Sequence, residues 1–243
     1  NEDYQSYQTG LDAEMNVEFA LNDARTFYNY AIKTLGAEKE HIDLIVNGTS
    51  GQINQMITRY NTIAQFMGED AEIMVYYAGH GLPDEKTKEP YLIPVDISGT
   101  DLTNAISLEY LFQKLTEHET KRVTVILDAC FSGGARNESL IAARGVKVEP
   151  ENGVLLGNLI VFSSSSGNES SSSYDDKFHG LFTYYFLKKL QETKGDVSYK
   201  DMSDYLERTV KMESLIINNK IQTPNIQFSN DISKEWENWR LVE

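Results

Sequence analysis

Two stretches of sequence decide the fold: EIMVYYAGHG at residues 72–81 and RVTVILDACFSGG at residues 122–134. Each is a short apolar run rich in β-branched residues, followed by a glycine-containing turn that carries a reactive side chain, His80 in the first and Cys130 in the second. Such runs are typical of buried strands in a parallel sheet, and open α/β sheets bind ligands beyond the carboxyl ends of their strands. The sequence therefore predicts that His80 and Cys130 face one crevice.

The rest of the chain alternates between helical and strand patterns. We expect helices over 16–35, 52–67, 107–118, 181–191 and 199–211, and further strands over 41–46, 158–163 and 225–228. This alternation predicts a doubly wound, mostly parallel α/β sheet flanked by helices. No internal repeat or linker divides the 243 residues, so we expect a single domain with one sizeable core.

The two side chains at the strand ends suit acyl transfer. A thiol needs a base to become a good nucleophile, and an imidazole titrates near neutral pH, so His80 and Cys130 are predicted to form a catalytic dyad. The alternative for Cys130 is an inert buried thiol, because free cysteine is among the most buried residue types. For His179, the other candidate base, we expect a capping or loop role. No G-x-S-x-G elbow is present, so a serine nucleophile is not expected.

The motifs resemble those of metacaspases and their bacterial relatives. YYAGHG is similar to the Y-x-G-H-G of that family, and DACFSGG to its D-x-C-x-S-G. Further matching motifs follow in the family's order: NDA at 22–24, PVD at 94–96, HGLFT at 179–183 and QTP at 222–224. The resemblance implies a caspase-like fold and cysteine endopeptidase activity. It also implies an oxyanion hole made by the backbone N–H groups of Gly81 and Cys130.

The resemblance also divides the domain into parts. It implies a larger catalytic part at about 1–135, a connecting loop at about 136–157, a smaller part at about 158–230 and a C-terminal tail at 231–243. Relatives can be cut in the connecting loop during activation. Arg136, Arg144 and Lys147 would suit self-cleavage there, and the alternative is an ordinary surface loop. The family's first strand has no counterpart in this sequence, so we expect it to lie upstream of Asn1.

Substrate preference follows from acidic residues. In metacaspases, the acidic residue two positions before the nucleophile and another in the N-D-A motif bind a basic P1 side chain. By resemblance these are Asp128 and Asp23. Buried carboxylates need partners, and a guanidinium or ammonium group supplies one, so we expect cleavage after Arg or Lys. The alternatives are a turn-capping role for Asp128 and a solvent-facing helix position for Asp23.

Charge and cysteine content limit the partners. Acidic residues outnumber basic ones by 37 to 22, giving a net charge of −15. This balance disfavours nucleic acid, and it suits basic substrates or a solubilising surface. One cysteine excludes an intramolecular disulfide. Without a run of about 18 apolar residues, no membrane segment is expected. The expected partners are therefore proteins or peptides with a basic P1 residue, whereas localisation and oligomeric state are not predicted.

No cofactor is expected. Many metacaspases bind calcium through clustered carboxylates, but the segments KEPY at 88–91 and GGARN at 133–137 lack such clusters. Asp84, Glu85 and Asp96 remain as scattered carboxylates, so the sequence gives little support for a calcium site. A zinc site is not expected either, because one cysteine and four scattered histidines show no ligand spacing.

Three functional classes fit these features. The first is a cysteine endopeptidase with a basic P1 preference, the second is a regulatory caspase-like module that binds partners with weak turnover, and the third is a clostripain- or legumain-type peptidase of different specificity. The presence of both His80 and Cys130 favours an active enzyme. Two serine clusters, at 163–166 and 170–173, predict a flexible loop, and by resemblance this loop walls the substrate cleft.

Overall fold

A mixed sheet of four strands forms the centre of the molecule. The computed structural model describes residues 16–131 and 153–242. The strands are β1 (Glu72–Ala78), β5 (Arg122–Asp128), β6 (Leu159–Ser163) and β9 (Asn225–Phe228), in the order β1-β5-β6-β9. β1, β5 and β6 are parallel, and β9 runs antiparallel to β6. The prediction of a mostly parallel sheet is thus confirmed.

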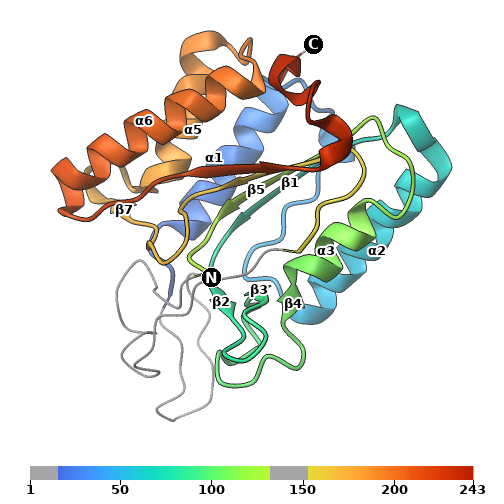
Figure 1. Cartoon of the computed structure of the whole chain (residues 1–243), viewed down its shortest axis with the longest axis horizontal. Coiled ribbons are helices and arrows are strands. Elements are labelled where there is room, and N and C mark those ends of the chain that lie inside the picture. The colour runs from blue at the N-terminus through green and yellow to red at the C-terminus, as the bar shows by residue number, and fades with distance from the viewer. Residues whose placement is uncertain (1–15, 132–152, 243) are drawn as a thin grey trace.

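Helices cover both faces of this sheet (Figure 1). α1 (Ala20–Lys33), α5 (Leu181–Thr193) and α6 (Tyr199–Asn218) lie on one face, and α2 (Ser50–Met67) and α3 (Leu108–Leu115) lie on the other. Successive strand side chains point to opposite faces of a sheet, so the buried strands feed two cores. Ile126 packs with the residues of α5 and α6, whereas its neighbours Val125 and Leu127 pack with those of α2 and α3. A three-layer α/β domain results.

Short strands lie at the carboxyl end of the sheet and were not predicted. β2 (Gly81–Pro83), β3 (Pro90–Leu92) and β4 (Ile106–Ser107) form a small antiparallel sheet, and β7 (Ser173–Tyr174) pairs with β8 (His179–Gly180). Strands of two or three residues are too short to show an alternating pattern in sequence. One of these short strands begins directly after His80, so the small sheet helps to fix the candidate histidine.

The expected strand at 41–46 is wrong. Residues Lys39–His41 form a short 3-10 turn, and Ile42 is extended, with φ −117° and ψ 127°, but no strand is formed over 42–46. A strand exists only through hydrogen bonds to a neighbour, and no described strand pairs with this segment. Apolar alternation can predict an extended chain but not the neighbour that makes it a strand.

Helix ends differ from the prediction where backbone conformation decides them. α1 begins at Ala20, after Phe19 adopts a left-handed conformation with φ 65°. α6 continues past Lys211 to Asn218 and stops where Asn219 becomes left-handed, with φ 54°. No helix in the described part of the chain, α6 included, is long and apolar enough to cross a membrane.

Candidate active site

The strand register places the segments that lead to His80 and Cys130 side by side. In the β1–β5 pair, Glu72 lies opposite Arg122 and Ala78 lies opposite Asp128, a constant offset of 50 positions. The ladder ends at Ala78 and Asp128, two residues before His80 and Cys130 in their segments. The chains are still adjacent there, because the Gly79 N–H donates to the Asp128 carbonyl at 3.3 Å.

Gly81 packs closely against the segment that carries Cys130. A Cβ added to Gly81 would lie 2.6 Å from a ring carbon of Phe131 and 3.1 Å from the carbonyl oxygen of Cys130. The first distance is shorter than a real Cβ contact and the second is unusually tight, so a side chain at this position would force Phe131 to move. The backbone that follows His80 therefore packs directly on Cys130 and Phe131.

The backbone of His80 is held from two directions. Its carbonyl oxygen accepts hydrogen bonds from the Tyr77 hydroxyl at 2.8 Å and the Ile93 N–H at 3.0 Å. The His80 side chain is only 4% exposed, and that of Cys130 only 5%. Both candidate catalytic groups thus lie in a fixed, largely dehydrated site, where electrostatic interactions are stronger than in water.

The sulfur of Cys130 contacts the predicted serine loop. This loop, residues 164–172, connects β6 to β7. The Ser171 N–H donates to the Cys130 sulfur at 2.7 Å, and the Ser171 carbonyl lies 3.7 Å from the same sulfur. Ser164 closes the loop on the same strand end, since its hydroxyl donates to the Ala129 carbonyl at 3.2 Å and hydrogen-bonds the Ser171 hydroxyl.

Asp23 and Asp128 reach the first turn of α5 from two elements. Asp23, on α1, accepts from the Gly180 N–H at 3.0 Å and lies 2.7 Å from His179 Nδ1. Asp128, at the end of β5, accepts from the Thr183 hydroxyl at 2.6 Å and from the Thr183 N–H at 3.3 Å. Carboxylates are stabilised at a helix N-terminus by its unpaired N–H groups and dipole.

Both carboxylates are fully buried, at 0% exposure. The alternative of a solvent-facing Asp23 is therefore wrong. A side-chain to backbone bond made by Asp128 does exist, and it holds the start of α5. Sequence reasoning assigned both aspartates to one basic P1 side chain, but it missed their contacts near the start of α5, Asp23 with Gly180 and Asp128 with Thr183.

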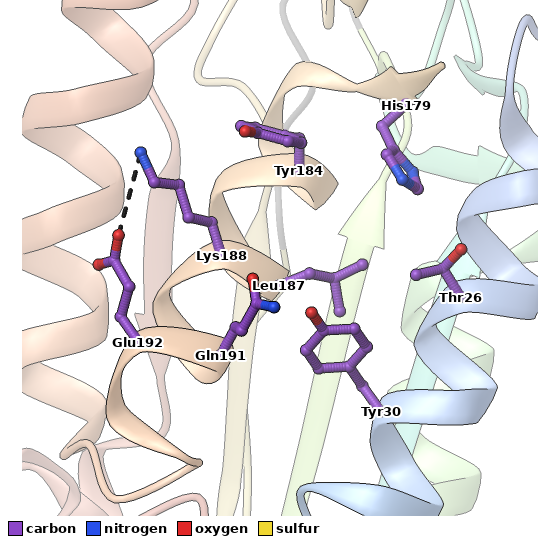
Figure 2. A pocket seen from close by; sticks show the side chains of 8 residues that line it. All are labelled: Thr26, Tyr30, His179, Tyr184, Leu187, Lys188, Gln191 and Glu192. Carbon is purple, nitrogen blue, oxygen red and sulfur yellow. Dashed lines mark ion pairs between the residues drawn. The ribbon is translucent and has the colours of Figure 1, made fainter. Parts of the chain in front are cut away.

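His179 has a defined partner in the structure. Besides its contact with Asp23, its ring lines a pocket of about 220 Å³ between α1 and α5 (Figure 2). Thr26 and Tyr30 contribute from α1, and the remaining lining residues are Tyr184, Leu187, Lys188, Gln191 and Glu192. Neither His80 nor Cys130 lines this pocket. His179 thus belongs to the Asp23 carboxylate and not to the Cys130 thiol.

Two of the scattered carboxylates have structural partners. Asp84 accepts from the Lys86 and Thr87 N–H groups at 2.9 and 2.8 Å in a tight turn, and these bonds, with that from Thr87 the stronger, hold the pKa of Asp84 below its usual value. Asp96 accepts from the Ser50 N–H at 2.8 Å at the first residue of α2. Within residues 16–131 and 153–242, no group of three or more acidic, histidine or cysteine side chains is placed to hold a metal ion.

Some predicted residues lie outside the described part of the chain. These are Arg136, Arg144 and Lys147, the candidate self-cleavage sites. Conversely, the structure adds two residues to the site, Ser171 and Gln222. Gln222 belongs to the QTP motif, and its sequence position gave no indication that it contacts the serine loop.

Comparison with known proteins agrees with this arrangement. The caspase domain family model matches residues 1–234, and the chain belongs to that family, whose members are cysteine peptidases. A Geobacter sulfurreducens protein of known structure superposes with a TM-score of 0.54 at 18% identity, over 78% of this chain and 79% of that one. Caspase-1 from Spodoptera frugiperda gives a TM-score of 0.55 at 14% identity, over 86% and 78%.

At these identities the two likenesses show the fold alone. No curated protein sequence matches the chain significantly. The assignment of function within the family therefore depends on the site residues of this chain.

Proposed function

We propose that this protein is a cysteine endopeptidase in which Cys130 is the nucleophile and His80 is the general acid and base. The observation that carries the proposal is the parallel β1–β5 pair, whose strands end side by side two residues before His80 and Cys130. Contact of Gly81 with the Cys130 backbone supports it, because the candidate oxyanion donors belong to these two residues.

The reaction divides into two steps with these groups. The Cys130 thiol gives its proton to His80, and the thiolate attacks the scissile carbonyl carbon. The N–H groups of Gly81 and Cys130 stabilise the oxyanion, and His80 then protonates the departing amine. Water, deprotonated by His80, attacks the resulting thioester and releases the acid and the free thiol.

A basic P1 residue is the proposed specificity. Asp23 and Asp128 are both fully buried and both reach the start of α5. Their negative charge near the carboxyl end of β5 favours Arg or Lys over Asp in a substrate, because an acidic P1 residue would meet like charge in a desolvated site. An enzyme of this specificity would also cut its own chain after Arg136, Arg144 or Lys147, which we propose as self-cleavage sites.

A covalent probe tests the dyad and the specificity together. A peptidyl acyloxymethyl ketone with Arg at P1 should label the wild-type protein, and labelling should disappear in Cys130→Ala and fall sharply in His80→Ala. The matched probe with Asp at P1 should label weakly. Equal labelling of the wild type and Cys130→Ala by the Arg probe would show that the nucleophile is not Cys130. Labelling by the Asp probe alone would leave the dyad intact and overturn the basic specificity.

A further inference from the structure

Gln222 ties together the two ends of the serine loop. Its side-chain amide donates to the Ser164 carbonyl at 2.9 Å, and its side-chain oxygen accepts from the Ser172 N–H at 2.8 Å. Gln222 is itself fixed, because its backbone N–H donates to the Ser214 hydroxyl on α6 at 3.0 Å. The side chain is fully buried, at 0% exposure. A buried amide whose donor and acceptor are both used rigidifies the groups that it joins.

The neighbouring residue holds the tip of the same loop. The Thr223 N–H and hydroxyl donate to the Glu169 carboxylate at 2.5 and 3.1 Å, and the Ser166 hydroxyl donates to the Thr223 carbonyl at 2.8 Å. Gln222 and Thr223 of the QTP motif therefore hydrogen-bond to the loop at its two ends and at its tip. The third member, Pro224, leads directly into β9.

These hydrogen bonds hold the loop where one of its N–H groups contacts the sulfur of Cys130. The Gln222 side-chain oxygen accepts from the Ser172 N–H, and the adjacent Ser171 N–H donates to the Cys130 sulfur at 2.7 Å. The neutral thiol can also donate to the Ser171 carbonyl at 3.7 Å, which is within hydrogen-bond range for sulfur, whereas only the N–H group is a donor to the sulfur. An N–H donor favours the charged form of its acceptor, so the loop is arranged to stabilise a thiolate.

From these contacts we infer that Gln222 is a positioning residue: it holds the serine loop so that the Ser171 N–H stabilises the Cys130 thiolate. The inference rests on the proposed function, in which Cys130 is the nucleophile. The Ser171 N–H would then act in addition to the base His80, because it stabilises the thiolate that attacks the substrate. Other titratable groups on the packed elements are Asp128 at the end of β5 and Glu169 in the loop, and the Glu169 carboxylate turns to Thr223.

Alkylation of the thiol tests the inference without a substrate. Cys130 is the only cysteine in the chain, so iodoacetamide uptake measured by intact mass reports on it alone. The rate is recorded against pH for the wild type and for Gln222→Met, which keeps the side-chain length and removes both hydrogen bonds. The loss of one donor to the thiolate should raise the midpoint of the pH profile by about one unit, a tenfold change in the ionisation constant.

Two further variants make the outcome decisive. Asn158→Ala removes a side-chain bond to the Thr120 carbonyl, 2.7 Å long, at the opposite end of β6, and its midpoint should match the wild type. Glu169→Ala frees the loop tip without disturbing the core and should shift the midpoint in the same direction as Gln222→Met. A midpoint within about 0.3 units of the wild type in folded Gln222→Met overturns the inference. If Gln222→Met does not fold, the same result in Glu169→Ala overturns it.

The outcome is separable from that of the proposed function. An unchanged midpoint in a variant series whose wild type still cleaves peptides through Cys130 removes only the role of Gln222. A shifted midpoint in a protein that hydrolyses no peptide leaves Gln222 positioning the thiol and removes the peptidase.

Discussion

Asp128 stabilises the start of α5, and in the proposed enzyme it also binds the P1 side chain of the substrate. Its carboxylate accepts from Thr183 at the start of α5 and is fully buried. The Asp128→Asn variant keeps an oxygen that accepts from Thr183 and removes the charge. We expect kcat/KM for an Arg substrate to fall at least about tenfold, because a charge-assisted hydrogen bond contributes roughly 1.5 to 3 kcal/mol. The rate of Cys130 alkylation should change little.

A matched variant separates charge from packing. Thr183→Val removes the hydroxyl that donates to Asp128 and leaves the carboxylate in place. It should lower the melting temperature but keep the preference for Arg over a neutral P1 residue. If Asp128→Asn and Thr183→Val reduce the Arg preference equally, Asp128 acts only by holding α5.

Individual residues show where sequence reasoning stops. The positions of His80 and Cys130 just beyond β1 and β5 were predictable because each follows a strand of strong β character. The Asp23–His179 contact, at 2.7 Å, joins residues 156 positions apart and leaves no local pattern. Gln222 was visible as part of a motif, yet its role depends on the path of a loop that propensities do not determine.

At the scale of elements, α2 shows how a distant loop starts a helix. Thr49 forms a capping box with Gln52, and Asp96 adds a carboxylate on the Ser50 N–H at 2.8 Å. Asp96→Ala should cost about 1 kcal/mol, like the loss of a helix cap, and lower Tm by about 2–4 °C in a chain of this size. Asp96→Asn should fall between the two proteins in a thermal melt. A Tm for Asp96→Ala within about 1 °C of the wild type would show that the capping box alone suffices.

The contacts of Asp84 and Asp96 also predict how the activity depends on calcium. Asp84 and Asp96 have carboxylate oxygens engaged by backbone N–H groups, whereas calcium needs six to eight oxygen ligands. We therefore expect hydrolysis of an arginyl reporter to persist in excess chelator. Loss of activity in chelator, with recovery on calcium addition and not magnesium, would contradict this expectation.

The strands also show which elements a sequence pattern can predict and which it cannot. β9 was predicted with its observed bounds, and β1 lies within the quoted stretch 72–81, whose apolar run is a local signal. The segment 42–46 has the same local signal but no described partner. The short strands β2, β3 and β4 have the opposite property, since their partners and not their sequences make them strands.

Helices cover the two faces of the central sheet (Figure 1), and His80 and Cys130 follow the carboxyl ends of β1 and β5. The parallel β1–β5 pair ends two residues before His80 and Cys130, and the parallel β5–β6 pair leads the chain into the serine loop that contacts Cys130. The α/β class and the order of the main elements were predictable from the alternation of patterns. The loop contacts that complete the site follow from the folded chain alone.

The most direct test of the dyad is hydrolysis of an arginyl reporter by the wild type, Cys130→Ala, His80→Ala and the double variant, with folding checked by circular dichroism. Each single variant should lose at least about a thousandfold in kcat, and the double variant should be no worse than Cys130→Ala, because members of one catalytic unit are not additive. Activity of folded Cys130→Ala within about tenfold of the wild type would contradict the account, since the loss of a true nucleophile costs far more.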